Sequence, residues 1–263
     1  IAIIILFIAS LRISLSISVA NLTRGMESRV VKSFDVSINE YPYATFVRNV
    51  DLRPNWCGGS LIMVQAVLST AYCAGGRSSK RINIKTYHGA AVPKRASVVR
   101  TVDEVEVSPK YDASKGRHNL AVLFLDKRVP LCPYIKKIPL AVRNAENWHH
   151  MYTAGWGKQV VRKFPDFADS RHLRATRQII ISPAKCSKSA GFEASISTVC
   201  TEPVKSFHYK DEGNGLISNN NKFLYGVLSF VTNDGVSVYT SVTAHHRWIT
   251  DTCVAMYKRH CGK

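Results

Sequence analysis

The feature that most constrains the fold is a series of short runs of apolar, β-branched and aromatic residues that starts at Tyr41. The runs include YATFVRNV, GGSLIMVQAVLS, RINIKTYH, SVVRTVDEVEV, NLAVLFL, FLYGVLSFV and VSVYTSV, and turn-forming Gly, Pro, Asn and Asp residues separate them. Short strands at such regular spacing are typical of antiparallel barrels and sandwiches. The sequence therefore predicts an all-β protein, and its 263 residues suffice for one large or two ordinary units.

Only the C-terminal segment has the periodicity of a helix. Its apolar residues recur at positions i, i+4, i+7 and i+8, which places them on one helical face: Ile249, Cys253, Met256 and Tyr257. Lys258 and Arg259 follow near the end of the segment, where cations suit the helix dipole. We expect an α-helix over roughly residues 244–259.

The first twenty residues are almost wholly apolar and contain one charge, Arg12, which interrupts the run before it reaches the length of a membrane span. Residues 18–20 read SVA, a small-x-small pattern that signal peptidase accepts. We therefore expect residues 1–20 to be a signal peptide and the protein to be secreted and extracellular. A buried strand or an anchor helix is the alternative, and no other segment could span a membrane.

Secretion gives the seven cysteines a structural meaning, because thiols pair in an oxidising compartment. Their odd number leaves at least one cysteine over. Residues 21–23 read NLT, so Asn21 is a candidate glycosylation site at the expected mature N-terminus. We expect neither a metal site nor a cofactor.

The charge balance bears on the choice of partner. The chain has 36 Lys and Arg residues against 18 Asp and Glu residues, which gives a formal net charge of +18. Such an excess favours polyanions, such as heparin-like glycans, anionic lipid or lipopolysaccharide, and acidic proteins. The cations are dispersed along the chain, so a soluble basic protein without a polyanion site is an equal alternative. We expect no nucleic-acid partner.

Six segments, in their order and spacing, resemble those of the trypsin-like serine proteases. They are CGGSLI at residues 57–62, VLSTAYC at 67–73, NLAVLFL at 119–125, AGWG at 154–157, YKDEGNGL at 209–216 and VSVYT at 236–240. The resemblance implies a trypsin-like domain at residues 30–263. It also implies two six-stranded antiparallel β-barrels, over roughly residues 45–135 and 140–243, with the active site between them and a C-terminal α-helix.

The resemblance places Tyr72 at the position of the catalytic imidazole, Asn119 at that of the carboxylate and Glu212 at that of the nucleophile. A phenol with a pKa near 10 is no base at neutral pH, an amide does not compensate an imidazolium, and a carboxylate is a poor nucleophile towards a peptide. Lys210 stands where a glycine supplies part of the oxyanion hole. The resemblance therefore predicts an inactive homologue.

A shifted register would bring another base to the site, because His118 lies beside Asn119 and His208 lies beside Tyr209. Against such a shift, Cys73 directly follows the imidazole position, as it does in the family. Asp211 likewise directly precedes the nucleophile position.

The resemblance also implies an altered specificity pocket. Ser229, Phe230 and Val231 stand in place of an SWG strand, and Val231 brings a branched side chain to a glycine position. Ser237 replaces a second glycine, and Ser206 occupies the pocket floor, where a trypsin has aspartate. We expect a narrowed or filled pocket, unless these changes are neutral drift.

Arg29 and Val30 resemble the activation site of the family, and residues 21–29 would then form a short propeptide. Asp211 occupies the position of the carboxylate that pairs with the new N-terminus. Lys32 and Ser33 replace the two glycines that normally follow, so Asp211 is equally well an ordinary loop carboxylate.

The resemblance pairs Cys57 with Cys73 and Cys186 with Cys200 in disulfides. The remaining cysteines are Cys132, Cys253 and Cys261, and Cys132 could cross-link to either of the other two.

We expect a secreted, non-catalytic homologue that acts by binding a protein. Its role would be that of a decoy, of a cofactor or regulator in a proteolytic or immune cascade, or of a venom, saliva or reproductive-fluid component. The loop composition resembles that of arthropod members of the family. One alternative is a cationic defence protein that binds heparin or lipopolysaccharide, similar to the inactive heparin-binding members in granulocytes. A minor alternative is an active endopeptidase with a displaced triad.

Overall fold

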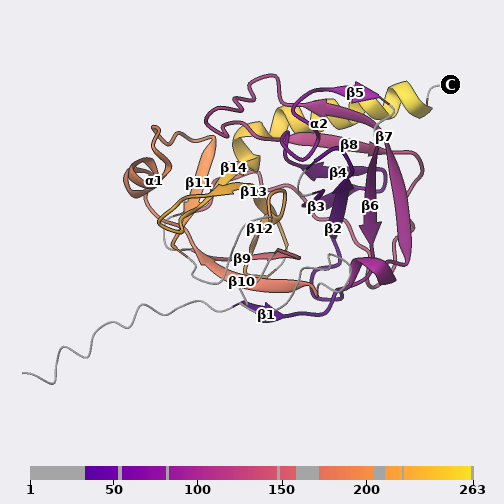
Figure 1. Ribbon diagram of the computed structural model, residues 1–263, viewed down its shortest axis with the longest axis horizontal. Helices are drawn as coiled ribbons and strands as arrows, with labels where there is room; N and C mark the ends of the chain where they lie inside the picture. The colour runs from indigo at the N-terminus through magenta and orange to yellow at the C-terminus, as the bar shows by residue number, and fades with distance from the viewer. Residues whose placement is uncertain are drawn as a thin grey trace, which may run out of the picture. The chain divides into compact units, whose positions relative to one another are not determined.

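The computed structural model describes residues 33–261 except for residues 53–54, 81–82, 147–148, 158–171, 204–210 and 221. Several sequence predictions therefore lie outside the described residues: the signal peptide, the propeptide, Asn21, Arg29, Val30, Ser206, His208, Lys210 and the side chain of Cys261. The described strands form two antiparallel sheets (Figure 1).

The first sheet closes into a six-stranded barrel, as predicted. Its strands run in the order β5-β7-β6-β2-β3-β4-β8, and a further pairing of β7 with β8 closes the ring, which leaves β5 as an addition at the edge. The strands are β2 (Ala44–Asn49), β3 (Trp56–Met63), β4 (Ala66–Ser69), β5 (Ser79–Lys80), β6 (Ile84–His88), β7 (Val98–Val107) and β8 (Ala121–Leu125).

The inward and outward alternation of the sequence is clearest in β6. Ile84, Thr86 and His88 are buried inside the barrel, whereas Lys85 is exposed and Tyr87 is half-buried on the outside.

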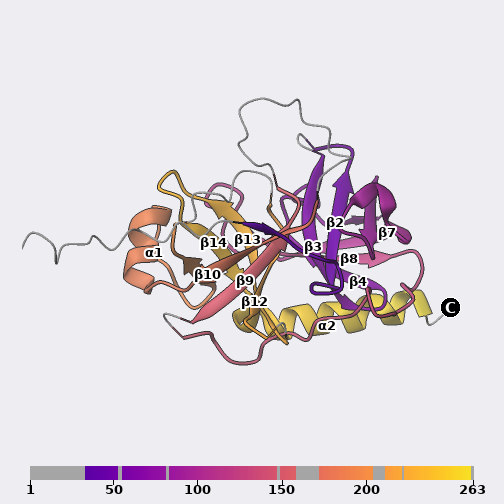
Figure 2. The same cartoon turned by 90° about the horizontal axis from the view of Figure 1, so that it is seen from below.

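The second sheet has the order β1-β10-β9-β12-β13-β14-β11. Between β10 and β11 there is one isolated bridge, Ile180 to Thr201, in place of a ladder, so this barrel is closed less completely than the first. The strands are β1 (Phe34–Asp35), β9 (His150–Gly155), β10 (Arg174–Ile179), β11 (Thr198–Thr201), β12 (Gly215–Ser218), β13 (Leu224–Val231) and β14 (Ser237–Ser241). Figure 2 shows the strands of the two sheets side by side.

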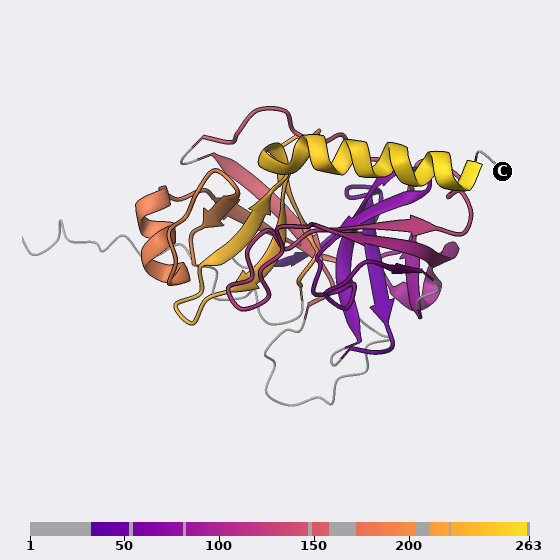
Figure 3. The same ribbon diagram turned by 90° about the horizontal axis from the view of Figure 1, so that it is seen from above.

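The C-terminal helix α2 (Val242–Cys261) begins directly after β14 and is two residues longer at each end than predicted. Ile249, Cys253 and Met256 are buried, which confirms the apolar face. The helix packs against both barrels (Figure 3). No helix in the described part of the chain is long and apolar enough to cross a membrane.

A second helix, α1 (Pro183–Ala190), was not predicted, and the expectation of a single helix was wrong. Its signals are local: Ser182 caps the N-terminus, Pro183 occupies the first turn and Gly191 ends the helix with φ 72°. The segment is too short and too polar for its periodicity to stand out. A 3-10 turn, η2 (Pro93–Arg95), lies between β6 and β7.

The largest hydrophobic cluster lies between the barrels and under α2. It contains Phe46 and Phe124 from the first barrel, Trp156 and Val227 from the second, and Met256 from the helix. Burial of so many large side chains holds the two barrels together as one unit.

The structure contains the disulfides Cys57–Cys73 and Cys186–Cys200, the two pairs that the resemblance implies. Cys132 and Cys253 carry free thiols, so the considered cross-link between them is absent. Cys132 is half-buried beside the first barrel, and Cys253 is buried on the face of α2 that packs against the core.

Candidate functional site

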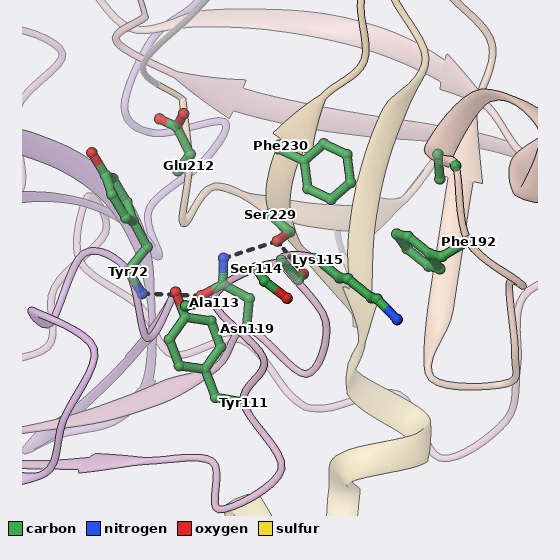
Figure 4. Close-up of a pocket in the computed structure, with 13 residues that line it drawn as sticks. Tyr72, Tyr111, Ala113, Ser114, Lys115, Asn119, Phe192, Glu212, Ser229 and Phe230 are labelled. Carbon is green, nitrogen blue, oxygen red and sulfur yellow. Dashed lines mark hydrogen bonds between the residues drawn. The ribbon is translucent and has the colours of Figure 1, made fainter.

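A pocket of about 490 Å³ lies between the two barrels. Its walls come from segments far apart in the sequence: the turn after β4, the loop from β7 to β8, the end of α1, the turn before β12 and the end of β13. The main side chains that line it are Tyr72, Tyr111, Lys115, Asn119, Phe192, Glu212, Ser229 and Phe230 (Figure 4).

Asn119 is buried among these side chains, with 3% of its surface exposed. Its Oδ1 accepts a hydrogen bond from the backbone N–H of Tyr72 at 3.0 Å, and its Nδ2 donates to Oγ of Ser229 at 2.8 Å. The Ser229 hydroxyl in turn donates to the carbonyl oxygen of Gly116 at 2.8 Å. An amide fits this position because it has both an acceptor and donors, whereas an ionised carboxylate has acceptors alone.

Tyr72 and Glu212 lie on the same side of the pocket (Figure 4). The Tyr72 side chain is 40% exposed, and the carbonyl oxygen of Glu212 accepts a hydrogen bond from the N–H of Gly58 at 2.8 Å. The Cys57–Cys73 disulfide braces the segments beside both residues. A phenol, a carboxamide and a carboxylate thus occupy the three positions to which the resemblance assigns the catalytic triad.

The turn that carries Glu212 is locked by its neighbours. Oδ1 of Asp211 accepts hydrogen bonds from the N–H of Gly157 at 2.7 Å and from Nδ2 of Asn214 at 2.6 Å. A Cβ on Gly58 would lie 1.8 Å from Oδ1 of Asn214, so the Asn214 side chain fills the space that this glycine leaves. Gly213 has φ +92°, which explains why a glycine follows Glu212.

His118, one of the two alternative bases, contacts His245 of α2. Nδ1 of His245 lies 2.7 Å from the carbonyl oxygen of Ser241, to which it must donate. Nε2 of His245 is therefore an acceptor, and it receives the Nδ1–H of His118 at 2.9 Å. Burial is the main cause that lowers the pKa of both rings below the ordinary histidine value, so both are neutral near pH 7.

The structure brings five of the predicted site residues into one pocket: Tyr72, Asn119, Glu212, Ser229 and Phe230. Val231 and Ser237 do not line it, and the Ser237 side chain is buried in β14. Because residues 204–210 lie outside the described part, the expected narrowing of the specificity pocket stays a prediction.

Sequence reasoning missed Tyr111, Lys115 and Phe192, which lie in loops on opposite sides of the pocket. No local sequence pattern marks these three residues, because the loops that carry them meet only in the folded chain. In the described residues, no group of three or more His, Cys, Asp or Glu side chains could hold a metal ion.

Two antiparallel barrels, a C-terminal helix behind them and a pocket in the seam define the two-barrel fold of the serine proteases. The family model described as Trypsin matches residues 30–249. The chain belongs to this family.

Relatives of the chain include arthropod proteins named as inactive proteases and others named simply as proteases. "Inactive serine protease scarface" of Drosophila melanogaster is 30% identical over 137 residues, which are 50% of this chain and 20% of that protein. The chain thus spans about a fifth of that relative. "Serine protease 1" of Drosophila melanogaster is 24% identical over 246 residues, or 89% of each chain. The solved structure of the scabies mite inactivated protease paralogue S-D1 has the same fold, with a TM-score of 0.74, 20% identity and coverage of 86% of this chain and 97% of that chain.

Proposed function

We propose that the protein is a secreted, non-catalytic member of the trypsin family that acts by binding a segment of a partner protein in the seam pocket. The observation that carries the proposal is the set of groups at Tyr72, Asn119 and Glu212. Acyl transfer needs a hydroxyl or thiol nucleophile next to a base. The two polar ends of the Asn119 amide are engaged in holding the Tyr72 backbone and Ser229, and the hydroxyl of Ser229 is committed to Gly116.

The magnitude of this deficit is large. In the serine protease subtilisin, removal of the nucleophile or of the base costs about 10⁶ in rate. In the described residues no histidine side chain forms a hydrogen bond with a serine hydroxyl. The inactive relatives named above support the same interpretation.

The pocket has the chemistry of a binding site for an extended segment with apolar side chains. Its walls carry four aromatic rings, which offer large rigid surfaces at low cost in conformational entropy: Tyr72, Tyr111, Phe192 and Phe230. Lys115 and Glu212 provide one cation and one carboxylate for orientation. The partner would be a protease, an inhibitor or another component of a proteolytic or immune cascade.

Affinity capture from the native secretion tests the proposal. The wild-type protein should retain a partner, and the variant Phe230→Ala should lose most of it because a central aromatic wall is gone. The matched control is Phe223→Ala, since Phe223 is 42% exposed and does not line the pocket. Equal capture by the wild type and by both variants would rule out the pocket as the binding site.

Secretion is tested separately, by sequencing the N-terminus of the protein recovered from the medium of expressing cells. We propose cleavage after Ala20 and glycosylation at Asn21, with a second cleavage after Arg29 in the processed form. A protein that stays in the cells would contradict this part of the proposal.

The second candidate function is polyanion binding, and the net charge of +18 favours it. A protein with a dedicated polyanion site should stay on a heparin column well above physiological salt, since each phosphate-like or sulfate contact adds to the salt dependence. Elution at physiological salt would remove this candidate.

A further inference from the structure

The first barrel has a groove of about 250 Å³ on its outer surface, and this groove shares no lining residue with the seam pocket. It lies over three neighbouring strands, β2, β6 and β7, and over the turn that follows β2. The side chains that give it its character are Arg48, Val50, Asn83, Lys85, Tyr87 and Thr101.

Two cations lie side by side in this groove. Arg48 of β2 and Lys85 of β6 are direct partners in the antiparallel register, and both side chains are exposed. Directly opposite side chains have Cβ atoms about 4.5–5.5 Å apart, and like charges at this spacing destabilise the sheet. The fold keeps a repulsion here that a bound anion would relieve.

Nothing within the described structure neutralises this pair. Among the described residues, no acidic side chain lines the groove, and neither Arg48 nor Lys85 takes part in an ion pair. Cations at other places on the same molecule do find carboxylates, as Arg174 does with Asp35 at 3.5 Å. Arg48 and Lys85 therefore differ from the other basic residues in the described part of the chain, because the strand register places them directly opposite each other without a carboxylate partner.

The groove also has an apolar part. Val50 is 51% exposed, and the half-buried ring of Tyr87 is held by an edge contact with Phe46, with 5.8 Å between the ring centroids. A rigid ring and an exposed aliphatic side chain beside two cations match a ligand that carries both apolar and acidic groups. A sulfated glycan would use the cations and leave the apolar surface without a partner.

We propose that this groove binds an acidic segment of a partner protein in which an aromatic or aliphatic side chain stands next to carboxylates. The carboxylates would pair with Arg48 and Lys85, and the apolar side chain would cover Val50 and Tyr87. This site is independent of the seam pocket, and the partner could engage either site without the other.

The test measures binding of a short fluorescent peptide, which contains Asp and Glu residues around one Phe and one Ile, by anisotropy at low ionic strength. Lys85→Glu should weaken binding by about tenfold or more, because it replaces an attraction by a repulsion. The same change should raise the midpoint of thermal unfolding by roughly 1–4 °C, because Arg48 gains an opposite charge across the strands.

The matched control is Arg143→Glu. Arg143 is exposed in the segment between the barrels, and its replacement by Glu changes the net charge by the same amount as Lys85→Glu. The affinity of Arg143→Glu for the peptide should fall by no more than about threefold, because only the screened long-range attraction is reduced. A peptide in which Ser replaces the Phe and the Ile should bind several times more weakly to the wild type.

Three results would overturn the proposal. One is equal loss of binding in Lys85→Glu and Arg143→Glu, which would mean a diffuse charge effect. Another is equal affinity of the Ser-containing peptide. The last is a heparin oligosaccharide that displaces the peptide and itself depends on Lys85, because it would assign the groove to a glycan. In all three cases the Phe230-dependent capture of a partner by the seam pocket would be unchanged. The proposal for the groove and the proposal for the seam pocket can therefore be refuted separately.

Discussion

Asn119 joins the two barrels at the seam pocket, so the replacement Asn119→Asp should destabilise the protein. Its Nδ2 donates to Oγ of Ser229 at 2.8 Å and its Oδ1 accepts from the N–H of Tyr72 at 3.0 Å. A carboxylate has no proton to donate. The Ser229 hydroxyl would then have to turn its single proton to the carboxylate, and the carbonyl oxygen of Gly116 would lose its donor.

The size of the effect follows from burial. Asn119 is 3% exposed, and an unsatisfied buried polar group costs about 1–3 kcal/mol, with more for a charged one. The free energy of unfolding should therefore fall by about 2–4 kcal/mol near neutral pH. For a domain of this size the midpoint of thermal unfolding would drop by roughly 5–15 °C.

The loss of stability in Asn119→Asp should depend on pH. Burial without a neighbouring imidazolium should raise the pKa of the introduced carboxyl group above its unfolded value of about 3.9. The folded state then holds the proton more tightly, so the loss of stability is complete above the folded pKa and shrinks as the pH falls through it. Unfolding in guanidinium chloride, followed by tryptophan fluorescence at pH 7.5 and 4.5, measures both values.

Asn39→Asp is the control for Asn119→Asp, because Asn39 is exposed in a turn and the chemical change is the same. Its free energy of unfolding should change by less than about 0.5 kcal/mol. The reasoning fails if Asn119→Asp is as stable as the wild type at pH 7.5, or if its loss of stability grows towards acid pH.

Two further predictions concern positions away from the pocket wall. Burial would raise the pKa of Glu104, but hydrogen bonds from His260 and Arg259 outweigh it and hold the pKa below its ordinary value. The pairing therefore stabilises the folded state at pH values above the unfolded pKa of Glu104, and this stabilisation is lost as the pH falls through the folded pKa. Glu104→Gln should lower the free energy of unfolding by about 3 kcal/mol at pH 7 and by much less in acid. Urea titrations that show no such pH dependence would contradict this prediction. Gly58→Ala should lower the midpoint of thermal unfolding because its Cβ would meet Oδ1 of Asn214 at 1.8 Å, and a second change, Asn214→Gly, should restore part of the loss; no restoration would mean that another contact is responsible.

The strands and the C-terminal helix could be predicted because their signals are local and repeated. The period-2 pattern of β6 and the i, i+4, i+7 pattern of Ile249, Cys253 and Met256 are sufficient to place a face towards the core. Helix α1 escaped prediction because eight residues are too few for a periodic pattern. The incomplete closure of the second barrel depends on backbone geometry near Ile180, which no side-chain pattern encodes.

The site could be predicted in part. The resemblance places Tyr72 and Asn119 in one site, because they lie at fixed distances from segments that the family shares. The loop residues Tyr111 and Phe192 had no such anchor, since they meet across the pocket only through the packing of the two barrels. The contact between His118 and His245, 127 positions apart in the sequence, likewise follows from the tertiary fold alone.

The most direct test of non-catalytic function is covalent labelling of the processed protein with a fluorophosphonate probe, beside an active trypsin-family protease as the positive control. The probe reacts with a serine whose hydroxyl is activated by a base. The groups at Tyr72, Asn119 and Glu212 predict no labelling above that of the unfolded protein. Labelling that disappears when one Ser or Thr is replaced by Ala would show an active nucleophile and contradict the account.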